Sequence, residues 1–273
     1  MTVLVTGSRG SVARSLLTLL RDRGLDARPA SKRPDDPQTL KCDLTDPATF
    51  PAALKGVTSV FLYAEPSCAG AFAEEAARAG VEHIVLLSSS AVLTPDPDSS
   101  LLAKSHLEVE RALEASPVRA TSLRPGSFAG NTLGWAWSVK SGRPVGLPYP
   151  GSHNDPIHEA DVAEAALAVL TDPALSGRPY TLTGPQSLTF AQQIDILSEV
   201  TGRDIPVKHL SREEWKEEMA EYIPASYADP LLDWWQSNDG RPVEITRTVQ
   251  ELTGHPARPF ADWAREHAAA FTG

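Results

Sequence analysis

Residues 2–13, TVLVTGSRGSVA, decide the fold of this chain. The stretch from Thr2 to Thr6 is rich in β-branched residues, which is typical of a strand buried on both faces of a parallel sheet. From Val12 to Arg23 the apolar residues recur at helical spacing. Gly7 and Gly10 stand between these two segments. The opening of the chain therefore predicts a strand, a glycine-rich turn and a helix.

The glycine turn suits the binding of a pyrophosphate. Gly7 lets the chain turn tightly, Gly10 lets the backbone approach the phosphates, and Ala13 is small enough for the helix to pack on the strand. The amino terminus of the helix adds free N–H groups and the positive end of the helix dipole. We therefore predict dinucleotide binding by the residues after the first strand, namely Gly7, Ser8, Arg9, Gly10, Ser11 and Val12.

Strand-like and helical patterns alternate through the first half of the chain. Further strands are expected at residues 25–30, 39–42, 58–63, 82–88 and 118–123, and helices at 48–54, 69–78 and 101–115. This order predicts an α/β fold, a Rossmann-type doubly wound parallel sheet over residues 1–150. Residues 151–273 are mostly helical in pattern and contain many aromatic residues. We expect them to complete the edge of the sheet and to form a small substrate lid, within one structural unit.

Composition excludes several classes of partner. The formal net charge of the 273 residues is -10, which argues against nucleic acid or an anionic membrane as the main partner. There is no run of eighteen apolar residues and no signal-peptide pattern at the start. Cys42 and Cys68 match no disulfide framework or metal spacing, so a cytoplasmic location is expected. The expected partner is a small-molecule substrate, bound by a monomer or homodimer.

The residues after the second predicted strand bear on the choice of dinucleotide. An acidic residue there would hold the ribose hydroxyls of NAD, but the chain has Ser31, Lys32 and Arg33, with Arg9 in the glycine turn. Cationic and hydroxyl groups suit a 2′-phosphate, so we expect NADP (as NADPH) and consider NAD less favoured. The alternative is that Lys32 and Arg33 are solvated loop charges near acidic neighbours.

Other cofactor contacts are expected where the remaining strands end. Asp43 and Leu44 follow the third strand, and Asp43 would accept from the adenine amino group or cap the helix at Pro47. The carboxyl ends of parallel strands lie at one edge of the sheet, where ligands bind. At the later strand ends the expected cofactor contacts are Tyr63, Ala64, Glu65, Ser88, Pro125, Gly126, Ser127 and Phe128.

Several stretches together resemble one known family. TGSRGSVA, CDLTD, VEHIVLLSSSAV, HLEVERALEAS, TSLRPGSFAGNTLGWA, PIHEADVAEAAL and YTLTGPQSLTFAQQIDIL are similar to the NmrA-like branch of the atypical short-chain dehydrogenase/reductase superfamily. The resemblance covers nearly the whole chain. It implies a parallel Rossmann-type sheet, NAD(P) binding and a small carboxyl-terminal substrate region. Members of the family include quinone- and azo-reducing enzymes, and cofactor-sensing regulators without turnover.

The chain departs from the superfamily at the usual catalytic pair, a tyrosine followed four residues later by a lysine. One register places Leu102 and His106 at these positions, and another places Ser100 and Lys104 there. Neither contains a tyrosine, so ordinary alcohol–ketone chemistry with a phenol as general acid is not expected from this helix.

Three residues are therefore candidates for a catalytic role. His106 titrates near neutrality and would donate a proton or hold a ribose hydroxyl, and a purely surface or ribose contact is the alternative. Tyr63 would supply a phenol from another element, or pack in the core. Ser89 would bond the nicotinamide ribose or the substrate, or simply end its strand. Lys104 lies two residues before His106, cannot share its face, and is expected to be a solvated charge.

An aromatic stretch follows the sixth strand. Phe128, Asn131 and Trp135 recur at helical spacing and would line an apolar pocket for a planar ligand, unless the stripe packs in the core. Ser90, Tyr149 and His153 complete the expected substrate-binding set. No metal site is expected, because His153 and His158 lack a third ligand at a usual spacing.

Together these patterns predict an NADPH-dependent oxidoreductase that transfers hydride to a small aromatic or conjugated acceptor, such as a quinone, a carbonyl or an imine-like group. Two other functions stay open: a non-catalytic NAD(P)-sensing regulator, and a non-redox enzyme on the same fold.

Overall fold

A computed structural model describes residues 1–272 of the chain. Its residues group into two compact units. The first consists of Met1–Pro125, Glu159–Leu182 and Thr248–His255. The second consists of Gly126–His158, Thr183–Arg247 and the residues from Pro256 onward. The boundary expected after residue 150 falls inside the second unit, between strands β7 (Val145–Leu147) and β8 (His153–Asn154).

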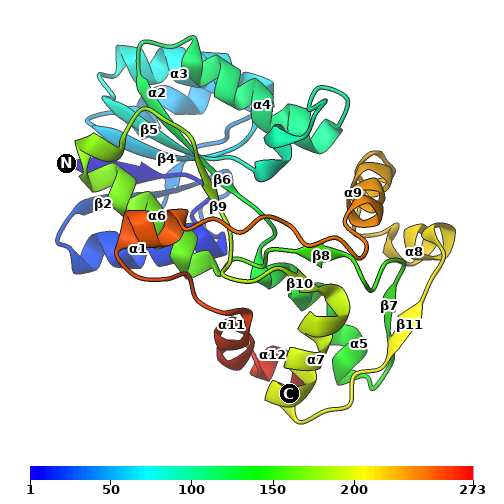
Figure 1. The fold of residues 1–273 in the computed structure, drawn as a ribbon. Coiled ribbons are helices and arrows are strands. Elements are labelled where there is room, and N and C mark those ends of the chain that lie inside the picture. The colour runs from blue at the N-terminus through cyan, green and yellow to red at the C-terminus, as the bar shows by residue number, and fades with distance from the viewer. Residues whose placement is uncertain (273) are drawn as a thin grey trace. The chain divides into compact units, whose positions relative to one another are not determined.

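The first unit contains a seven-stranded sheet in the order β3-β2-β1-β4-β5-β6-β9 (Figure 1). Every neighbouring pair of strands in this sheet is parallel. The strands are β1 (Thr2–Val5), β2 (Asp26–Ser31), β3 (Leu40–Lys41), β4 (Ser59–Tyr63), β5 (His83–Leu87), β6 (Arg119–Pro125) and β9 (Tyr180–Leu182). The order reverses direction at β1, which confirms the predicted Rossmann-type, doubly wound sheet.

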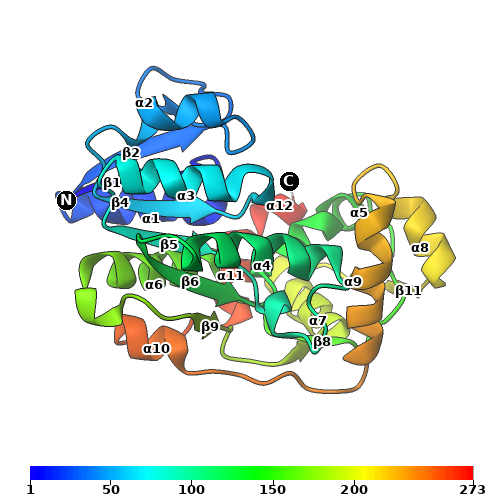
Figure 2. The same ribbon diagram turned by 90° about the horizontal axis from the view of Figure 1, so that it is seen from above.

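Helices cover both faces of this sheet (Figure 1). One face carries α2 (Phe50–Leu54), α3 (Ala69–Arg78) and α4 (Leu101–Glu114), and the other carries α1 (Ser11–Asp22), α6 (Glu159–Thr171) and α10 (Thr248–Thr253). Seen from above, α3 and α4 lie side by side (Figure 2).

The helices form where the sequence repeats apolar residues at helical spacing. Along α1, Val12, Leu16 and Leu20 are buried against the unit, while the opposite side of the helix is solvated. Strand β5 is buried along its whole length, from His83 through the apolar run that ends at Leu87. Phe50 of α2 and Phe72 of α3 pack in the core under these helices. Their ring centroids lie 5.1 Å apart in an edge-to-face arrangement.

The second unit has only two-stranded sheets and is mostly helical. Its strand pairs are β8 with β10 (Leu188–Thr189), antiparallel, and β7 with β11 (Val207–His209), parallel. Its α-helices are α5 (Ala136–Lys140), α7 (Phe190–Thr201), α8 (Arg212–Met219), α9 (Ala225–Ser237), α11 (Phe260–Glu266) and α12 (Ala269–Thr272). Capping boxes start α7 at Thr189 and α8 at Ser211, each with a glutamine or glutamate three residues on.

Tryptophans divide between core and surface in this unit. Trp263 is fully buried and stacks on Phe260 with ring centroids 5.7 Å apart. Trp235 packs edge-on against Trp215 at 5.0 Å, whereas its neighbour Trp234 is exposed. The divergence of these adjacent side chains is what a helix requires. None of the helices within residues 1–272 has the length and hydropathy that a membrane span needs.

Candidate functional site

The glycine turn joins β1 to α1 at the carboxyl edge of the sheet. Gly7 adopts a left-handed conformation with φ of 59°, which favours glycine, and the N–H of Gly10 donates to the carbonyl of Gly7 at 2.8 Å. Helix α1 then begins without a side-chain cap at Gly10 and without an acidic residue in its first turn. Its first N–H groups and its positive dipole end therefore stay available to an anion.

The turn also packs tightly against the end of β4. Thr6 bridges the two strands, because its hydroxyl donates to the carbonyl of Phe61 at 3.1 Å and accepts from the N–H of Tyr63 at 2.8 Å. A Cβ at Gly7 would lie 3.4 Å from the Cβ of Tyr63, and one at Gly10 would lie 3.3 Å from the carbonyl oxygen of Gly7. The backbone thus forms a cradle that side chains would fill, which fits a pyrophosphate.

Tyr63 is exposed beside this turn, with 56% of its surface accessible. The alternative that it packs in the core was therefore wrong. The next residues turn away through a short 3-10 helix, Pro66–Cys68, which Glu65 caps by accepting from the N–H of Ser67 at 3.0 Å. Glu65 is thus occupied in this turn, while Ala64 is half-buried between the two.

The end of β2 presents one exposed cation and one that is already paired. Ser31 is buried, and its hydroxyl accepts from the N–H of Arg33 at 3.2 Å. The Nζ atom of Lys32 lies 3.3 Å from Oδ2 of Asp43 and 3.2 Å from the hydroxyl of Thr45. The side chain of Arg33 is exposed, and no ion pair of it is found within residues 1–272. Lys32 is therefore an exposed charge paired with Asp43, and its contact with a phosphate stays a prediction.

Asp43 stabilises the loop after β3. Its carboxylate accepts from the hydroxyl of Thr45 at 2.7 Å and from its N–H at 3.0 Å, and these bonds, together with Lys32, lower the pKa of Asp43. The alternative that Asp43 caps the helix at Pro47 was wrong, because Asp46 accepts from the N–H of Ala48 there. Leu44 beside it is half-buried against the core under α2 and α3.

An open cavity of about 560 Å³ lies beside the glycine turn in the first unit. It is lined by Ser8 and Arg9 of the turn, by the outer side of α1, by Pro29, and by the loop from Asp35 to Thr39. Arg14 and Arg21 of α1 join Arg9 in this lining, against the carboxylates of Asp35 and Asp36. Its size is in the range of small-molecule sites, and its balance of charge is positive by one.

A buried polar network links the ends of β5 and β6 to α4. The hydroxyl of Ser88 donates to Glu110 Oε1 at 2.5 Å, and Arg124 holds the same carboxylate through Nε at 3.0 Å and Nη2 at 2.5 Å. Only 3% of Ser88 and 2% of Glu110 are exposed. The predicted contact of Ser88 with a cofactor is therefore corrected for its side chain, whose hydroxyl is used inside the fold.

Ser89 and Ser90 follow directly and are half-buried. Ser89 accepts from the N–H of Ala91 at 3.2 Å and so caps the 3-10 helix Ser90–Leu93. Strand β5 ends at Leu87, so Ser89 begins the following 3-10 helix and does not end the strand, and its role toward a ligand stays a prediction.

His106 lies one helical turn before Glu110 on the same face of α4. Its Nδ1 atom is buried without a hydrogen-bond partner among the described residues. Burial lowers the pKa of His106, against the opposing effect of the Glu110 charge, so the ring is neutral at pH 7. Lys104 is exposed, as predicted, and lies 3.9 Å from Glu108. A buried ring nitrogen without a protein partner is an atom that a ligand or water would satisfy.

The second unit contains the segment that continues from β6. The N–H of Ser127 donates to Asp155 Oδ1 at 3.0 Å, and Phe128 is half-buried and pairs with Ile157 in a parallel bridge. Gly126 lies so close to Asp155 that a Cβ there would overlap the carboxylate. Asp155 was not predicted from the sequence. The only signal was the glycine after Pro125, which required a close neighbour without identifying it.

The predicted aromatic stripe does not form. Residues Ala129–Trp135 are a 3-10 helix. At three residues per turn, Asn131 lies on the same face as Phe128, whereas Trp135 is rotated about 120° from that face. Asn131 is exposed, whereas Trp135 packs edge-on against Phe190 with centroids 5.9 Å apart. The core alternative is therefore correct for Trp135.

The other residues expected to contact the substrate already have packing or polar partners within the second unit. Tyr149 is half-buried against the cluster that α8 and α9 form around Trp215. His153 Nδ1 lies 3.1 Å from the hydroxyl of Ser187. His158 is buried, with Nε2 3.1 Å from a Glu266 carboxylate oxygen.

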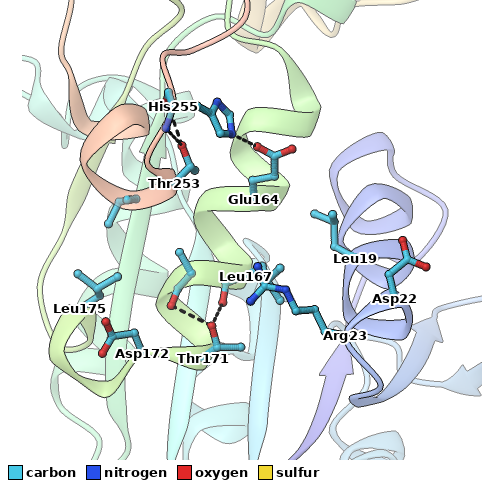
Figure 3. A pocket seen from close by; sticks show the side chains of 12 residues that line it. Leu19, Asp22, Arg23, Glu164, Leu167, Thr171, Asp172, Leu175, Thr253 and His255 are labelled. Atoms are coloured by element: carbon cyan, nitrogen blue, oxygen red, sulfur yellow. Dashed lines mark hydrogen bonds and ion pairs between the residues drawn. The ribbon is translucent and has the colours of Figure 1, made fainter.

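A second cavity in the first unit lies away from the glycine turn (Figure 3). Leu19 and Arg23, at the far end of α1, line it, and α1 has 12 residues, or about 18 Å of helix. In Figure 3 His255 points to Glu164, with 2.6 Å between Nε2 and Oε2. Asp161 offers a third ligand-type atom within 4.8 Å of these two, so the three side chains form a group that could hold a metal ion. Asp161 lies in the first turn of α6.

Comparisons with known proteins agree with the geometry of the glycine turn. A family profile described as NAD(P)H-binding matches residues 7–173. The chain is 35% identical over 281 residues to a (4-alkanoyl-5-oxo-2,5-dihydrofuran-3-yl)methyl phosphate reductase of Streptomyces griseus subsp. griseus, covering 98% of this chain and 99% of that one. It is 30% identical over 285 residues to an NAD(P)H azoreductase of Xenophilus azovorans, covering 98% and 99%.

Among solved structures, an NADPH-dependent quinone oxidoreductase of Escherichia coli in complex with NADPH matches with a TM-score of 0.81. The match covers 97% of this chain and 99% of that one at 23% identity, which shows a shared fold.

Proposed function

Because this chain belongs to the NAD(P)H-binding family, we propose that it is an oxidoreductase that transfers hydride from NADPH to a small, electron-poor acceptor. The acceptor class is aromatic or conjugated: a quinone, a carbonyl or an imine-like group. The observation that carries the proposal is the glycine turn, which leads from the central strand into a helix whose first N–H groups have no side-chain cap.

The pyrophosphate of the cofactor would lie on this turn. Gly7 and Gly10 leave the backbone open, and the N–H groups of Ser11 and Val12 belong to the first turn of α1. Ser8 and Arg9 line the neighbouring cavity and would complete the phosphate contacts. The cofactor supplies a hydride from its nicotinamide when bound, and the chain's own residues bind and orient it.

The preference for NADPH rests on the cations around the adenosine end of this site. The side chain of Arg33 is exposed, with no ion pair found within residues 1–272. Arg9 and Arg14 line the cavity beside the glycine turn. Guanidinium groups bind a 2′-phosphate through charge-assisted, bidentate hydrogen bonds. Lys32 contributes less, because Asp43 already neutralises it.

The acceptor class follows from what the helix α4 lacks. It contains no tyrosine, so no phenol from this helix protonates a carbonyl. A quinone or a conjugated system accepts hydride with little acid assistance; one hydride and one proton convert it to the reduced product while NADPH becomes NADP⁺. The two relatives named above, an azoreductase and a reductase of an oxo-dihydrofuran phosphate ester, support this class of acceptor.

Three side chains of the first unit are the proposed catalytic groups. His106 is neutral at pH 7 and has a free buried nitrogen, which suits a hydrogen bond to a ribose hydroxyl or to the acceptor better than proton donation as an imidazolium. Tyr63 presents an exposed phenol beside the glycine turn. Ser89 is half-buried after β5. The reacting proton then comes from solvent or from the Tyr63 phenol.

The segment after β6 would meet the nicotinamide and the acceptor. Gly126, Ser127 and Phe128 continue directly from the carboxyl end of a central parallel strand, the edge at which such sheets bind ligands. Ser90, Asn131, Tyr149 and His153 remain the proposed substrate contacts. The stretches LRPGSFAGN and PIHEADVA support placement in the NmrA-like branch, and we propose a monomer or homodimer.

The decisive experiment combines binding with turnover. Calorimetry of the purified protein should give stoichiometric binding of NADPH, tighter than that of NADH. A panel of quinones, azo dyes and unsaturated lactones with NADPH should then give steady loss of the nicotinamide absorbance. Binding without any oxidation of NADPH across the panel would favour a cofactor sensor, and product formation without net oxidation would favour a non-redox enzyme. Absence of binding would refute the proposal.

A further inference from the structure

Asp155 holds the start of the segment that leaves β6. Its Oδ1 atom accepts from the N–H of Ser127 at 3.0 Å. Its carboxylate fills the space where a side chain at residue 126 would stand, so only glycine fits there. Two adjacent residues of the segment are therefore adapted to one carboxyl group, Gly126 by lacking a side chain and Ser127 by its N–H.

Backbone bonds extend this attachment in both directions. The N–H of Ile157 donates to the carbonyl of Ser127 at 2.8 Å, and the N–H of Ala129 donates to the carbonyl of Ile157 at 2.9 Å. The N–H of Gly184 donates to the carbonyl of Asp155 at 3.2 Å. Residues 126–129 thus form a short parallel ladder with residues 155–157, and the side chain of Asp155 is the point at which the ladder begins.

The carboxyl group of Asp155 lies among uncharged groups. Burial raises the pKa of Asp155 to about 6, and the N–H groups of Ser127 and of Asp155 itself act in the opposite direction. No charged side chain contributes to this shift among the described residues. The titratable neighbours on its own segment are His153, which contacts Ser187, and His158, which contacts Glu266. Asp155 is half-buried, and a carboxylate partly removed from water without a cation is retained at a cost in stability, which indicates a use other than stability.

We propose that Asp155 is a positioning residue that fixes Gly126–Phe128, and through this segment the nicotinamide end of the active site. This inference rests on the proposed function, because that function assigns the segment to the cofactor and the acceptor. Positioning groups act through geometry, and displacement of a binding segment by about 1 Å costs as much as a hundredfold in rate.

The first test compares Asp155→Ala with Asp155→Asn. Alanine removes the acceptor of the Ser127 N–H, and we expect kcat/KM for the quinone to fall roughly tenfold to a hundredfold. Asparagine keeps an oxygen in the same place and should restore most of the loss. Asp195→Ala, at an exposed site on α7, is the matched control and should leave kcat/KM unchanged.

The pH profile separates positioning from a merely structural role. Ionised Asp155 accepts the Ser127 N–H more strongly than the protonated form, so wild-type kcat/KM should decline relative to Asp155→Asn as the pH falls through about 6. The ratio of the two variants should therefore titrate with that midpoint. A flat ratio would overturn the proposal.

A second variant perturbs the same contact from the other side, and its own loss can be measured whether or not Asp155→Ala folds. Gly126→Ala places a methyl group against the carboxylate and should displace the segment, with a similar loss of kcat/KM. If Asp155 causes this loss, Gly126→Ala in the Asp155→Ala background should add little. Independent, additive losses would contradict the proposed link between the two residues.

Amide hydrogen exchange of the protein without cofactor supplies a readout besides activity. The Ser127 N–H should exchange at least tenfold faster in Asp155→Ala than in wild type, and Asp155→Asn should restore its protection. Equal exchange in all three proteins would overturn the inference even if the enzyme reduces quinones. Faster exchange in a protein that never oxidises NADPH would instead confirm the attachment and refute the proposed function.

Discussion

The ammonium group of Lys32 and the carboxylate of Asp43 form an ion pair, with 3.3 Å between Nζ and Oδ2, across the ends of β2 and β3. The loop after β3 thereby neutralises one of the two cations that follow β2. The other cation, Arg33, is exposed, and we expect it to meet the 2′-phosphate of NADPH. Selection between the two nicotinamide cofactors should therefore depend on a single guanidinium more than on the local sum of charge.

Replacing Arg33 by alanine should weaken NADPH binding more than NADH binding. A charge-assisted bond to the 2′-phosphate contributes about 1.5–3 kcal/mol, so the expected loss for NADPH is roughly tenfold or more, with little change for NADH. Calorimetric titration with each cofactor measures this, and Lys32→Ala serves as the paired comparison with a smaller effect. Equal losses for both cofactors would mean that the phosphate binds elsewhere.

Asp43→Asn should shift the preference in the opposite direction. The amide oxygen of asparagine can still accept from the N–H and the hydroxyl of Thr45. The ion pair with Lys32 is lost, so Lys32 becomes a second cation for the 2′-phosphate. We expect a several-fold gain in NADPH affinity relative to NADH, larger at low salt because the new attraction is screened. Asp46→Asn, which removes a charge from the neighbouring cap, is the control and should not change the ratio.

Gly7→Ala should abolish binding of both cofactors. Alanine at φ of 59° is strained by roughly 1–2 kcal/mol, and its methyl group would stand in the phosphate cradle near Tyr63. Gly24→Ala is the matched control, since Gly24 has φ of 67° with open space around it. Both variants should lose similar stability in urea denaturation, but only Gly7→Ala should lose NADPH binding.

Glu110→Ala should destabilise the first unit strongly. It leaves Arg124 partly buried without its carboxylate and Ser88 without its acceptor, and breaking a buried pair in this way costs about 3–5 kcal/mol. Glu108→Ala, on the exposed side of the same helix, should cost less than about 1 kcal/mol. Urea unfolding at pH 7 compares them, and a similar small loss for both variants would show that the network is not a stabilising element.

His83 should make the protein less stable in mild acid. Burial, with help from Arg119, lowers the pKa of His83 to about 4, whereas the unfolded chain titrates near 6.5. Between these values the unfolded state binds more protons, so the free energy of unfolding should decline as the pH falls from about 6.5 to about 4, by up to about 3 kcal/mol. His83→Gln should flatten this part of the curve in urea denaturations across that range, and an unchanged curve would assign the acid sensitivity to other groups.

Much of the first unit could be predicted because its signals are local. The buried strands β1 and β5 and the apolar face of α1 follow from periodicity, and the glycine turn follows from the position of Gly7 and Gly10 between them. The ion pair of Lys32 with Asp43 could not be predicted in this way, since it joins residues of different strands. The same is true of Ser88, whose hydroxyl meets a glutamate 22 residues away.

The second unit was harder to anticipate for a physical reason. The stripe expected from Phe128 to Trp135 assumed 3.6 residues per turn, and the tighter 3-10 helix rotates Trp135 out of line. Asp155 gives no periodic signal, because its contact is with Gly126, which is far away in the sequence. Long-range contacts of single polar residues are the part of a site that sequence patterns alone leave open.

The two units alternate along the chain, with changes at residues 125, 158, 182, 247 and 255. Strand β9 and helices α6 and α10 return to the first unit after long excursions into the second. A single crossover between genes of two relatives would therefore mix pieces of both units and could not exchange one of them whole. Point substitutions, or joint replacement of the three segments of the second unit, would keep both units whole, whereas shuffling of halves would not.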